Sequence, residues 1–391
     1  MTGRIQSLPP GPTTLIRGAR QLLTLRGPAG PRRGTVLGEL GIIPDGAVLI
    51  RGGKILETGP SRRVENLALA RGAEEINATG RVVLPGFVDS RTQPVAIAGL
   101  PSRRLQARLQ SALNRMARHG TTTAVASVAS SPATAGVLSA LRVLGGLNGQ
   151  PIDVISDYFI NAATQEANGQ LPFTDIICSE VLPVLSRRKL AELVSVNCRT
   201  LGDTAVRRIL TQAHALGFRS IVHAGALPSC WTTAIEMRAA AVVPDLLENP
   251  TGEALPRPVY ILLPALRHSQ REYPPARALI TGESAVALAS GFGIESGPTY
   301  NMQMVISLAS SEMGMSPAEA ISAATINAAY ALARGHLCGS LEPGKAADLL
   351  LLNLEDYREL AAQFGVNHVH MVLKNGNIIY REGEVSSWTR R

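Results

Sequence analysis

The feature that most constrains the fold of this sequence is the alternation of short apolar runs with amphipathic segments between residues 82 and 344. The amphipathic segments include residues 104–118, 203–216 and 316–334. The apolar runs are predicted strands, at residues 82–88, 121–126, 153–159, 193–198, 220–223, 258–263 and 285–289. Strands that alternate with helices are typical of parallel sheets, and a long series of them predicts a (β/α) barrel.

One helix start has a strong local signature. In Ser316-Pro317-Ala318-Glu319, a serine precedes a proline and is followed three residues later by a glutamate. Serine is a favoured N-cap, proline fits the first helical position, and a glutamate at the third can return a bond to the cap. We therefore predict a helix that begins after Ser316.

The two ends of the chain both have the pattern of a small β domain. Residues 47–51 and 54–57 flank Gly52-Gly53, which predicts a hairpin. Near the other end, apolar runs at 347–352, 369–373 and 378–380 are separated by turn residues. We expect residues 1–83 and 345–391 to complete one β domain, and residues 84–344 to form the barrel inserted between them.

Composition excludes several classes of protein. With 45% hydrophobic and 17% charged residues, the 391-residue chain is of the globular type. It contains no apolar stretch long enough to span a bilayer, and residues 1–12 lack the pattern of a secretory signal. The four cysteines are widely spaced without a CxxC pair. We therefore expect neither a disulfide framework nor a zinc ribbon, and a cytoplasmic location.

The net charge of +8 does not predict a nucleic-acid partner. Arginine supplies nearly all of the 38 basic residues, because lysine occurs at four positions only. The arginines form short clusters such as Arg32-Arg33 and Arg187-Arg188. A nucleic-acid groove needs a concentrated basic stripe with aromatic platforms between the charges. We expect no nucleic acid and no membrane among the partners.

Several motifs resemble those of a known family. They include Val82-Val83-Leu84-Pro85-Gly86-Phe87-Val88-Asp89, Gly120-Thr121-Thr122-Thr123, and Gly339-Ser340-Leu341-Glu342-Pro343-Gly344-Lys345. The sequence resembles the amidohydrolase superfamily, and within it most closely the imidazolonepropionases. The likeness runs from Leu15 to about Gly383. It implies a distorted (β/α)8 TIM barrel with a composite β-sandwich formed by both termini.

The resemblance also implies a metal centre, usually zinc or iron. A divalent ion lowers the pKa of bound water and polarises the amide carbonyl. The family places a His-x-His pair after the first barrel strand, a histidine at the fifth and an aspartate at the eighth. A glutamate three residues after the fifth-strand histidine is a candidate acid or base.

This sequence departs from the family pattern at most of those positions. The His-x-His positions hold Arg91 and Gln93, the glutamate position holds Ala226, and the aspartate position holds Gly291, so only His223 remains. A guanidinium has no lone pair for a cation. One histidine cannot complete a tetrahedral site, so we expect no bound metal.

Alternative roles remain open for the residues of this degraded site. His223 is a relic ligand or a core histidine hydrogen-bonded at a strand end. Arg91 either anchors an anionic ligand in place of the ion or fills the vacated site by pairing with Asp89 or Glu295. Glu295 either supplies a carboxylate or lies on a surface loop. Together with Gln93, these are the candidate ligand-binding residues.

The cysteines allow a further interpretation. Cys198 and Cys230 lie near the fourth and fifth predicted strands. A thiol nucleophile would need a base within hydrogen-bond reach, for which only His223 is suitably placed. Buried cysteines more commonly pack as small apolar side chains. No G-x-S-x-G motif suggests a serine nucleophile.

Two functional hypotheses follow. In the first, the chain is a non-catalytic homologue, a pseudoenzyme with a binding, regulatory or scaffold role. In the alternative, it is a divergent hydrolase of carbon–nitrogen bonds in small cyclic amides, acting without metal or with ligands recruited from Gln93, His223 and Glu295. The expected partners are a small anionic or heterocyclic ligand and either further copies of the chain or an intact paralogue.

Overall fold

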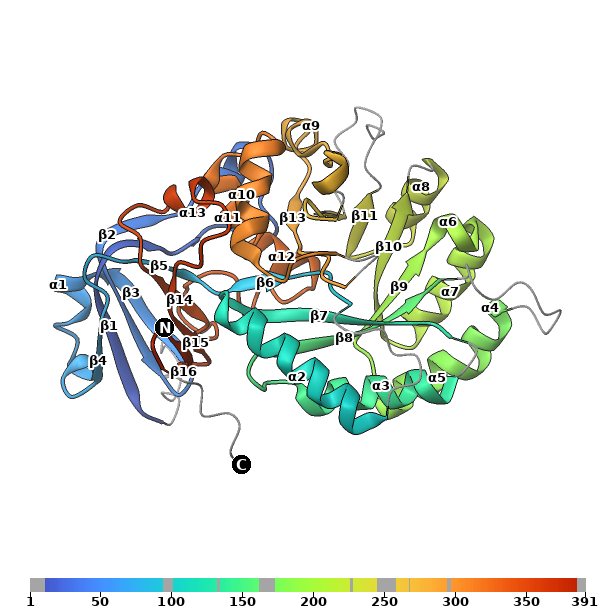
Figure 1. The fold of residues 1–391 in the computed structure, drawn as a ribbon, viewed down its shortest axis with the longest axis horizontal. Coiled ribbons are helices and arrows are strands. Elements are labelled where there is room, and N and C mark those ends of the chain that lie inside the picture. Colours follow the sequence, from blue (N-terminus) through green and yellow to red (C-terminus); the bar gives the residue numbers. More distant parts are fainter. Residues whose placement is uncertain are drawn as a thin grey trace, which may run out of the picture.

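The structure is a computed structural model that describes residues 11–93, 101–131, 134–161, 173–225, 228–244, 258–266, 268–293 and 297–384. Figure 1 shows a barrel of strands and helices beside a second sheet, in which the blue strands β1 to β4 and the red strands β14 to β16 come together. Among these residues no helix is long and apolar enough to cross a membrane.

Eight parallel strands form the barrel, in the spatial order of the sequence. They are β6 (Phe87–Asp89), β7 (Thr121–Ala129), β8 (Asp153–Ile160), β9 (Leu193–Asn197), β10 (Arg219–Gly225), β11 (Ala241–Pro244), β12 (Val259–Leu262) and β13 (Val286–Leu288). The first and last strands approach each other beyond their ends. There the Gly291 N–H donates to the Arg91 carbonyl (3.1 Å) and the Gln93 N–H to the Phe292 carbonyl (2.8 Å). The barrel is therefore nearly closed.

Helices surround the barrel, and short helices connect its elements (Figure 1). Amphipathic α2 buries Leu105, Leu109 and Leu113 against the strands and keeps its charged side chains outside. The helices are α1 (Ser61–Val64), α2 (Ser102–Arg118), α3 (Thr134–Leu147), α4 (Phe173–Ile176), α5 (Leu182–Arg188), α6 (Cys198–Leu201), α7 (Asp203–Ala215), α8 (Pro228–Glu236), α9 (Ala276–Thr281), α10 (Met302–Glu312), α11 (Pro317–Ala323), α12 (Ile326–Ala331) and α13 (Glu359–Ala362).

The second sheet is mixed and contains both ends of the chain. Its order is β16-β15-β14-β5-β1-β2-β3, with β4 paired to β1. The strands are β1 (Thr13–Leu23), β2 (Ile42–Arg51), β3 (Lys54–Pro60), β4 (Glu74–Asn77), β5 (Val82–Pro85), β14 (Leu349–Leu352), β15 (Val369–Lys374) and β16 (Asn377–Arg381). The predicted fold class, a barrel beside a β-sandwich domain built from both termini, is confirmed.

The run predicted as one strand at 82–88 is two strands of different sheets. β5 pairs with β1 and β14, whereas β6 pairs with β7. Gly86 lies between them, and a Cβ on Gly86 would come within 2.3 Å of the Thr122 side chain. The chain therefore passes from one sheet to the other at a residue whose lack of a side chain the packing requires.

Two more predictions needed correction. The prediction omitted β11 (Ala241–Pro244), which directly follows Ala239 and Ala240, residues that favour a helix and so conceal the start of the strand. The segment 316–334 was predicted as one helix and is divided into α11 and α12 around Thr325, whose backbone is not helical (φ −128°, ψ −91°). The hydroxyl of Thr325 instead donates to the Ile321 carbonyl at 2.7 Å.

The predicted helix start at Ser316 is confirmed as a capping box. The Glu319 N–H donates to Ser316 Oγ (3.2 Å), and the Ser316 N–H donates to Glu319 Oε2 (2.7 Å). We expect Ser316→Ala to lower the free energy of unfolding by about 1 kcal/mol, because the first turn loses an acceptor. Ser311→Ala, on the exposed side of α10, is the control. Equal stabilities of the two variants in urea unfolding would contradict this prediction.

Candidate ligand site at the carboxyl end of the barrel

The barrel interior has an apolar layer with a polar layer above it. Every barrel strand contributes to the apolar cluster, which includes Val125, Ile155, Leu193 and Ile221. Side chains two residues apart on a strand point to the same face. The residues two positions further on therefore face the same interior, nearer the carboxyl ends: Ser127, Asp157, Ser195 and His223. This is the end at which barrels of this architecture bind small molecules.

Arg91 enters this polar layer from the segment after β6. Its side chain is fully buried, the largest such side chain among the described residues. Nη1 donates to Asp157 Oδ2 at 3.0 Å and also to Ser127 Oγ. The guanidinium carbon lies 4.4 Å from the centre of the Phe159 ring. The cation is thus held by one carboxylate, one hydroxyl and one aromatic face.

Asp157 is the anion that makes burial of Arg91 possible. It is fully buried, and its Oδ1 accepts from Ser195 Oγ (2.7 Å) while Oδ2 accepts from Ser127 Oγ (2.6 Å) and Arg91. The expectation that Arg91 pairs with Asp89 is therefore wrong. Sequence reasoning missed Asp157, although a carboxylate inside a predicted buried strand requires a cation or several donors nearby.

Asp89 instead bonds across the closing seam of the barrel. Its Oδ1 accepts from the Ser290 N–H at 3.0 Å, and its Oδ2 accepts from Ser290 Oγ. Complete burial raises the pKa of Asp89 to about 6, although the bonds from Ser290 act in the opposite direction. The carboxylate is therefore bonded to Ser290, and it also accepts from the Arg91 backbone.

Buried polar atoms without partners also lie in this layer. In the described part of the chain, Nε and Nη2 of Arg91 and Nε2 of His223 have no hydrogen-bond partner. The His223 ring lies 4.7 Å from that of Phe159, which the Arg91 guanidinium also contacts. Burial, and secondly the charge of Arg91, lower the pKa of His223 well below its usual value, so its imidazole is neutral at pH 7. Among the described residues, Nε2 therefore lacks the hydrogen bond expected of a core histidine.

The other predicted site residues are Gln93, Gly291, Ala226 and Glu295. Gln93 lies beyond the carboxyl end of β6. It is half-buried, and its backbone N–H bonds the Phe292 carbonyl. Gly291 has φ +65°, and the nearest atoms to a Cβ there would be those of Leu263, at 3.7 Å or more, so the contact is ordinary but the backbone disfavours a side chain. Ala226 and Glu295 lie outside the described residues, as does any pairing of Arg91 with Glu295.

The described residues at the positions where the family pattern places ligands do not form a site for a divalent metal. Arg91 offers only donors, Gly291 offers no side chain, and the Asp89 oxygens accept from Ser290. Within the described ranges no group of three or more His, Cys, Asp or Glu side chains could hold a metal ion. His223 alone cannot supply a coordination sphere.

The interpretation of Cys198 and Cys230 as free thiols is wrong, because they form a disulfide. Cys198 begins α6 immediately after β9, and Cys230 lies in α8 after β10. These neighbouring parallel strands pair Asn197 with His223, which brings the residues beyond their ends together, with the two Cα atoms 5.9 Å apart. Bonded sulfurs provide no thiolate, so neither residue is a nucleophile here.

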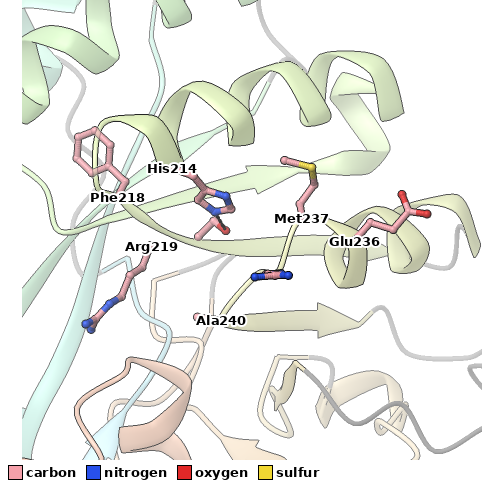
Figure 2. Close-up of a pocket in the computed structure, with 8 residues that line it drawn as sticks. His214, Phe218, Arg219, Glu236, Met237 and Ala240 are labelled. Atoms are coloured by element: carbon pink, nitrogen blue, oxygen red, sulfur yellow. Dashed lines mark hydrogen bonds between the residues drawn. The ribbon is translucent and has the colours of Figure 1, made fainter.

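A separate pocket of about 380 Å³ lies at the other end of the barrel (Figure 2). Arg219 and Ser220, at the start of β10, line it together with His214 and Glu236. The His214 ring bonds Ser220 Oγ through Nε2 at 2.9 Å. This pocket is remote from the polar layer, because residues at the start and end of β10 face opposite ends of the barrel.

The titration of Asp89 gives a testable pH dependence. Its pKa in the fold, about 6, lies above the ordinary value of 3.8, so the folded state binds the proton more tightly. The contribution of Asp89 to stability is fully present below pH 4 and is lost as the pH rises through 6, by up to about 3 kcal/mol. Asp89→Asn should remove this slope in urea unfolding measured between pH 4 and 7, whereas exposed Asp45→Asn should keep it. An unchanged slope in Asp89→Asn would contradict the assignment.

These features define a class of protein: parallel (β/α) barrels that bind small molecules at the carboxyl ends of their strands. The Amidohydrolase family model matches residues 82–379. The chain belongs to the amidohydrolase family.

Several relatives of this chain are imidazolonepropionases. That of Solibacter usitatus is 35% identical, over 93% of this chain and 97% of the relative. That of Geobacillus kaustophilus is 31% identical, over 95% of this chain and 98% of the relative. Among solved structures, an adenosine deaminase from Xanthomonas campestris has a TM-score of 0.73 at 16% identity, covering 97% of this chain and 95% of its own. At that identity the likeness shows the fold alone.

Proposed function

We propose that the chain is a hydrolase of carbon–nitrogen bonds in small cyclic amides. The observation that carries this proposal is the similarity to imidazolonepropionases along nearly the entire length of both proteins. Such end-to-end similarity includes the strands and helices that shape the mouth as well as the common barrel. It favours a substrate of related size and chemistry.

The polar layer supplies two groups that such a reaction needs without metal. Hydrolysis requires stabilisation of the oxygen that gains charge and a base for the attacking water. Arg91 has two buried donor atoms without partners, and neutral His223 has an unpartnered Nε2. Water would add to the carbonyl carbon and give a proton to His223. The carbon–nitrogen bond would then break as the nitrogen receives that proton.

A second candidate function is non-catalytic binding. It is favoured by the ion pair of Arg91 with Asp157, which occupies the interior where the family pattern places metal ligands. A pseudoenzyme of this kind would hold a small anionic or heterocyclic ligand, and would act through further copies of itself or through an intact paralogue. The absence of a metal remains a prediction under both functions. A cytoplasmic location remains one too, but the Cys198–Cys230 disulfide removes the cysteine argument for it.

Turnover and metal content together separate these functions. We expect purified protein to open the ring of hydantoin or of an imidazolone bearing a propionate, with less than a tenth of an equivalent of zinc or iron and no loss of rate in chelator. His223→Asn should lower kcat by about 10²–10⁴-fold. His214→Asn, which alters the remote pocket, is the matched control. Binding of the cyclic amide without turnover would favour the second candidate, and chelator-sensitive turnover would contradict catalysis without metal.

A further inference from the structure

The buried guanidinium of Arg91 forms hydrogen bonds with the described residues on one side only. Nη1 accounts for both of its hydrogen bonds, to Asp157 and Ser127, while Nε and Nη2 have no partner among the described residues. A role in filling space explains the bonded side. It does not explain the other side, because a buried donor without an acceptor costs about 1–3 kcal/mol. Unpaired groups of this kind in a folded protein indicate a ligand or a strained functional site.

The geometry of the free side selects the ligand chemistry. The Nε–H and one Nη2–H of a guanidinium are parallel and coplanar, and they match the two oxygens of a carboxylate in a bidentate pair. Neutral acceptors and spherical anions cannot satisfy both donors equally well. The unpartnered Nε2 of His223 lies close by, because both residues contact Phe159. An imidazole nitrogen can donate to a further ligand oxygen or accept from a ligand N–H, depending on its tautomer.

We propose that the Nε–Nη2 edge of Arg91, with His223 beside it, binds a carboxylate group of a small ligand. This inference rests on the proposed function and makes it more specific. When water adds to a cyclic amide carbonyl and the carbon–nitrogen bond breaks, that carbon becomes a carboxylate. One of its oxygens comes from the amide and the other from water. The edge of Arg91 is then a site for the reaction product, so small carboxylates should compete with the substrate.

Binding of acetate, measured by isothermal titration calorimetry at fixed ionic strength, tests the proposal. Wild-type protein should bind acetate at one saturable site, with acetamide and chloride at least tenfold weaker. Acetamide has the same shape without the charge, and chloride has the charge without the planar pair of acceptors. This comparison needs no variant, so it stands even if a substitution at Arg91 prevents folding.

Matched substitutions locate the site. Arg91→Lys keeps the charge but loses the two-donor edge, and should weaken acetate binding at least tenfold. Arg32→Lys is the control, since Arg32 is also buried but donates to the carbonyls of Glu39 and Leu25, away from the polar layer. Its acetate affinity should be that of the wild type.

The outcomes also separate this inference from the proposed function. Saturable acetate binding that depends on Arg91, in a protein without turnover, would overturn the hydrolase and leave the carboxylate site standing. Turnover in a protein that binds acetate no better than acetamide would overturn the carboxylate site and leave the hydrolase standing. Equal acetate affinities of wild type and Arg91→Lys would overturn the assignment to Arg91.

Discussion

Replacing Asp157 by alanine is expected to lower the free energy of unfolding by about 3–5 kcal/mol. The substitution removes the only carboxylate that contacts Arg91 in the described structure, and both side chains are fully buried. The guanidinium would then remain in the barrel interior with Ser127 and the Phe159 ring alone. Removing one member of a buried pair is costly because the other charge cannot regain its hydration.

Removing the positive charge should be less harmful than removing the negative one. In Arg91→Met, Asp157 keeps the hydroxyl donors of Ser127 and Ser195. In the double variant Arg91→Met/Asp157→Leu, both buried charges are gone, and we expect it to be more stable than Asp157→Ala. Replacement of a whole buried pair by apolar residues is often close to neutral.

An exposed ion pair provides the control for this series. Arg17 and Glu75 lie 2.7 Å apart, but their side chains are 48% and 55% exposed. Glu75→Ala should change stability by less than about 1 kcal/mol. Unfolding of the variants in guanidinium chloride measures all of these differences in the free energy of unfolding. A loss of under 1 kcal/mol in Asp157→Ala would contradict the buried pairing described above.

The sequence predicted the barrel well because its signal is repeated. Most of the barrel strands are apolar for several residues and the long helices α2 and α7 show the helical period, so errors at single positions do not change the pattern. The failures came where the apolar pattern continued across a boundary. β11 directly follows Ala239 and Ala240, which favour a helix, and the run at 82–88 conceals a change of sheet at Gly86. The apolar pattern of a segment does not predict which sheet its strand joins.

The site was only partly predictable from the sequence. The departure from the family pattern at positions 91, 93 and 291 could be predicted directly, because arginine and glycine offer no ligand atom on a side chain and glutamine offers only a carbonyl oxygen. The partner of Arg91 could not be read in the same way. Asp157 is 66 residues away on another strand, and the contact exists because β7 and β8 follow β6 around the barrel. Pairing of this kind depends on register, which one sequence does not supply.

The disulfide was missed for the same reason, and it carries the second large expected effect. Cys198 and Cys230 are separated by 32 residues, and a cross-link of that length should stabilise the fold by about 3–4 kcal/mol through the unfolded chain. We expect Cys198→Ser/Cys230→Ser to lose about this amount. Reducing agent should destabilise the wild type but not the double variant. The double variant therefore controls for any effect of the reducing agent other than cleavage of this disulfide.

A thiol count tests the pairing independently of stability. Of the four cysteines, Cys178 and Cys338 are free and buried, so protein denatured without reductant should show two reactive thiols, and four after reduction. Four thiols without reductant would contradict the bond. The bond ties α6 to α8, the helices after Asn197 and His223, which are paired residues of β9 and β10. Because it closes these two segments at the carboxyl end of the barrel, its reduction should also weaken acetate binding at Arg91 and His223.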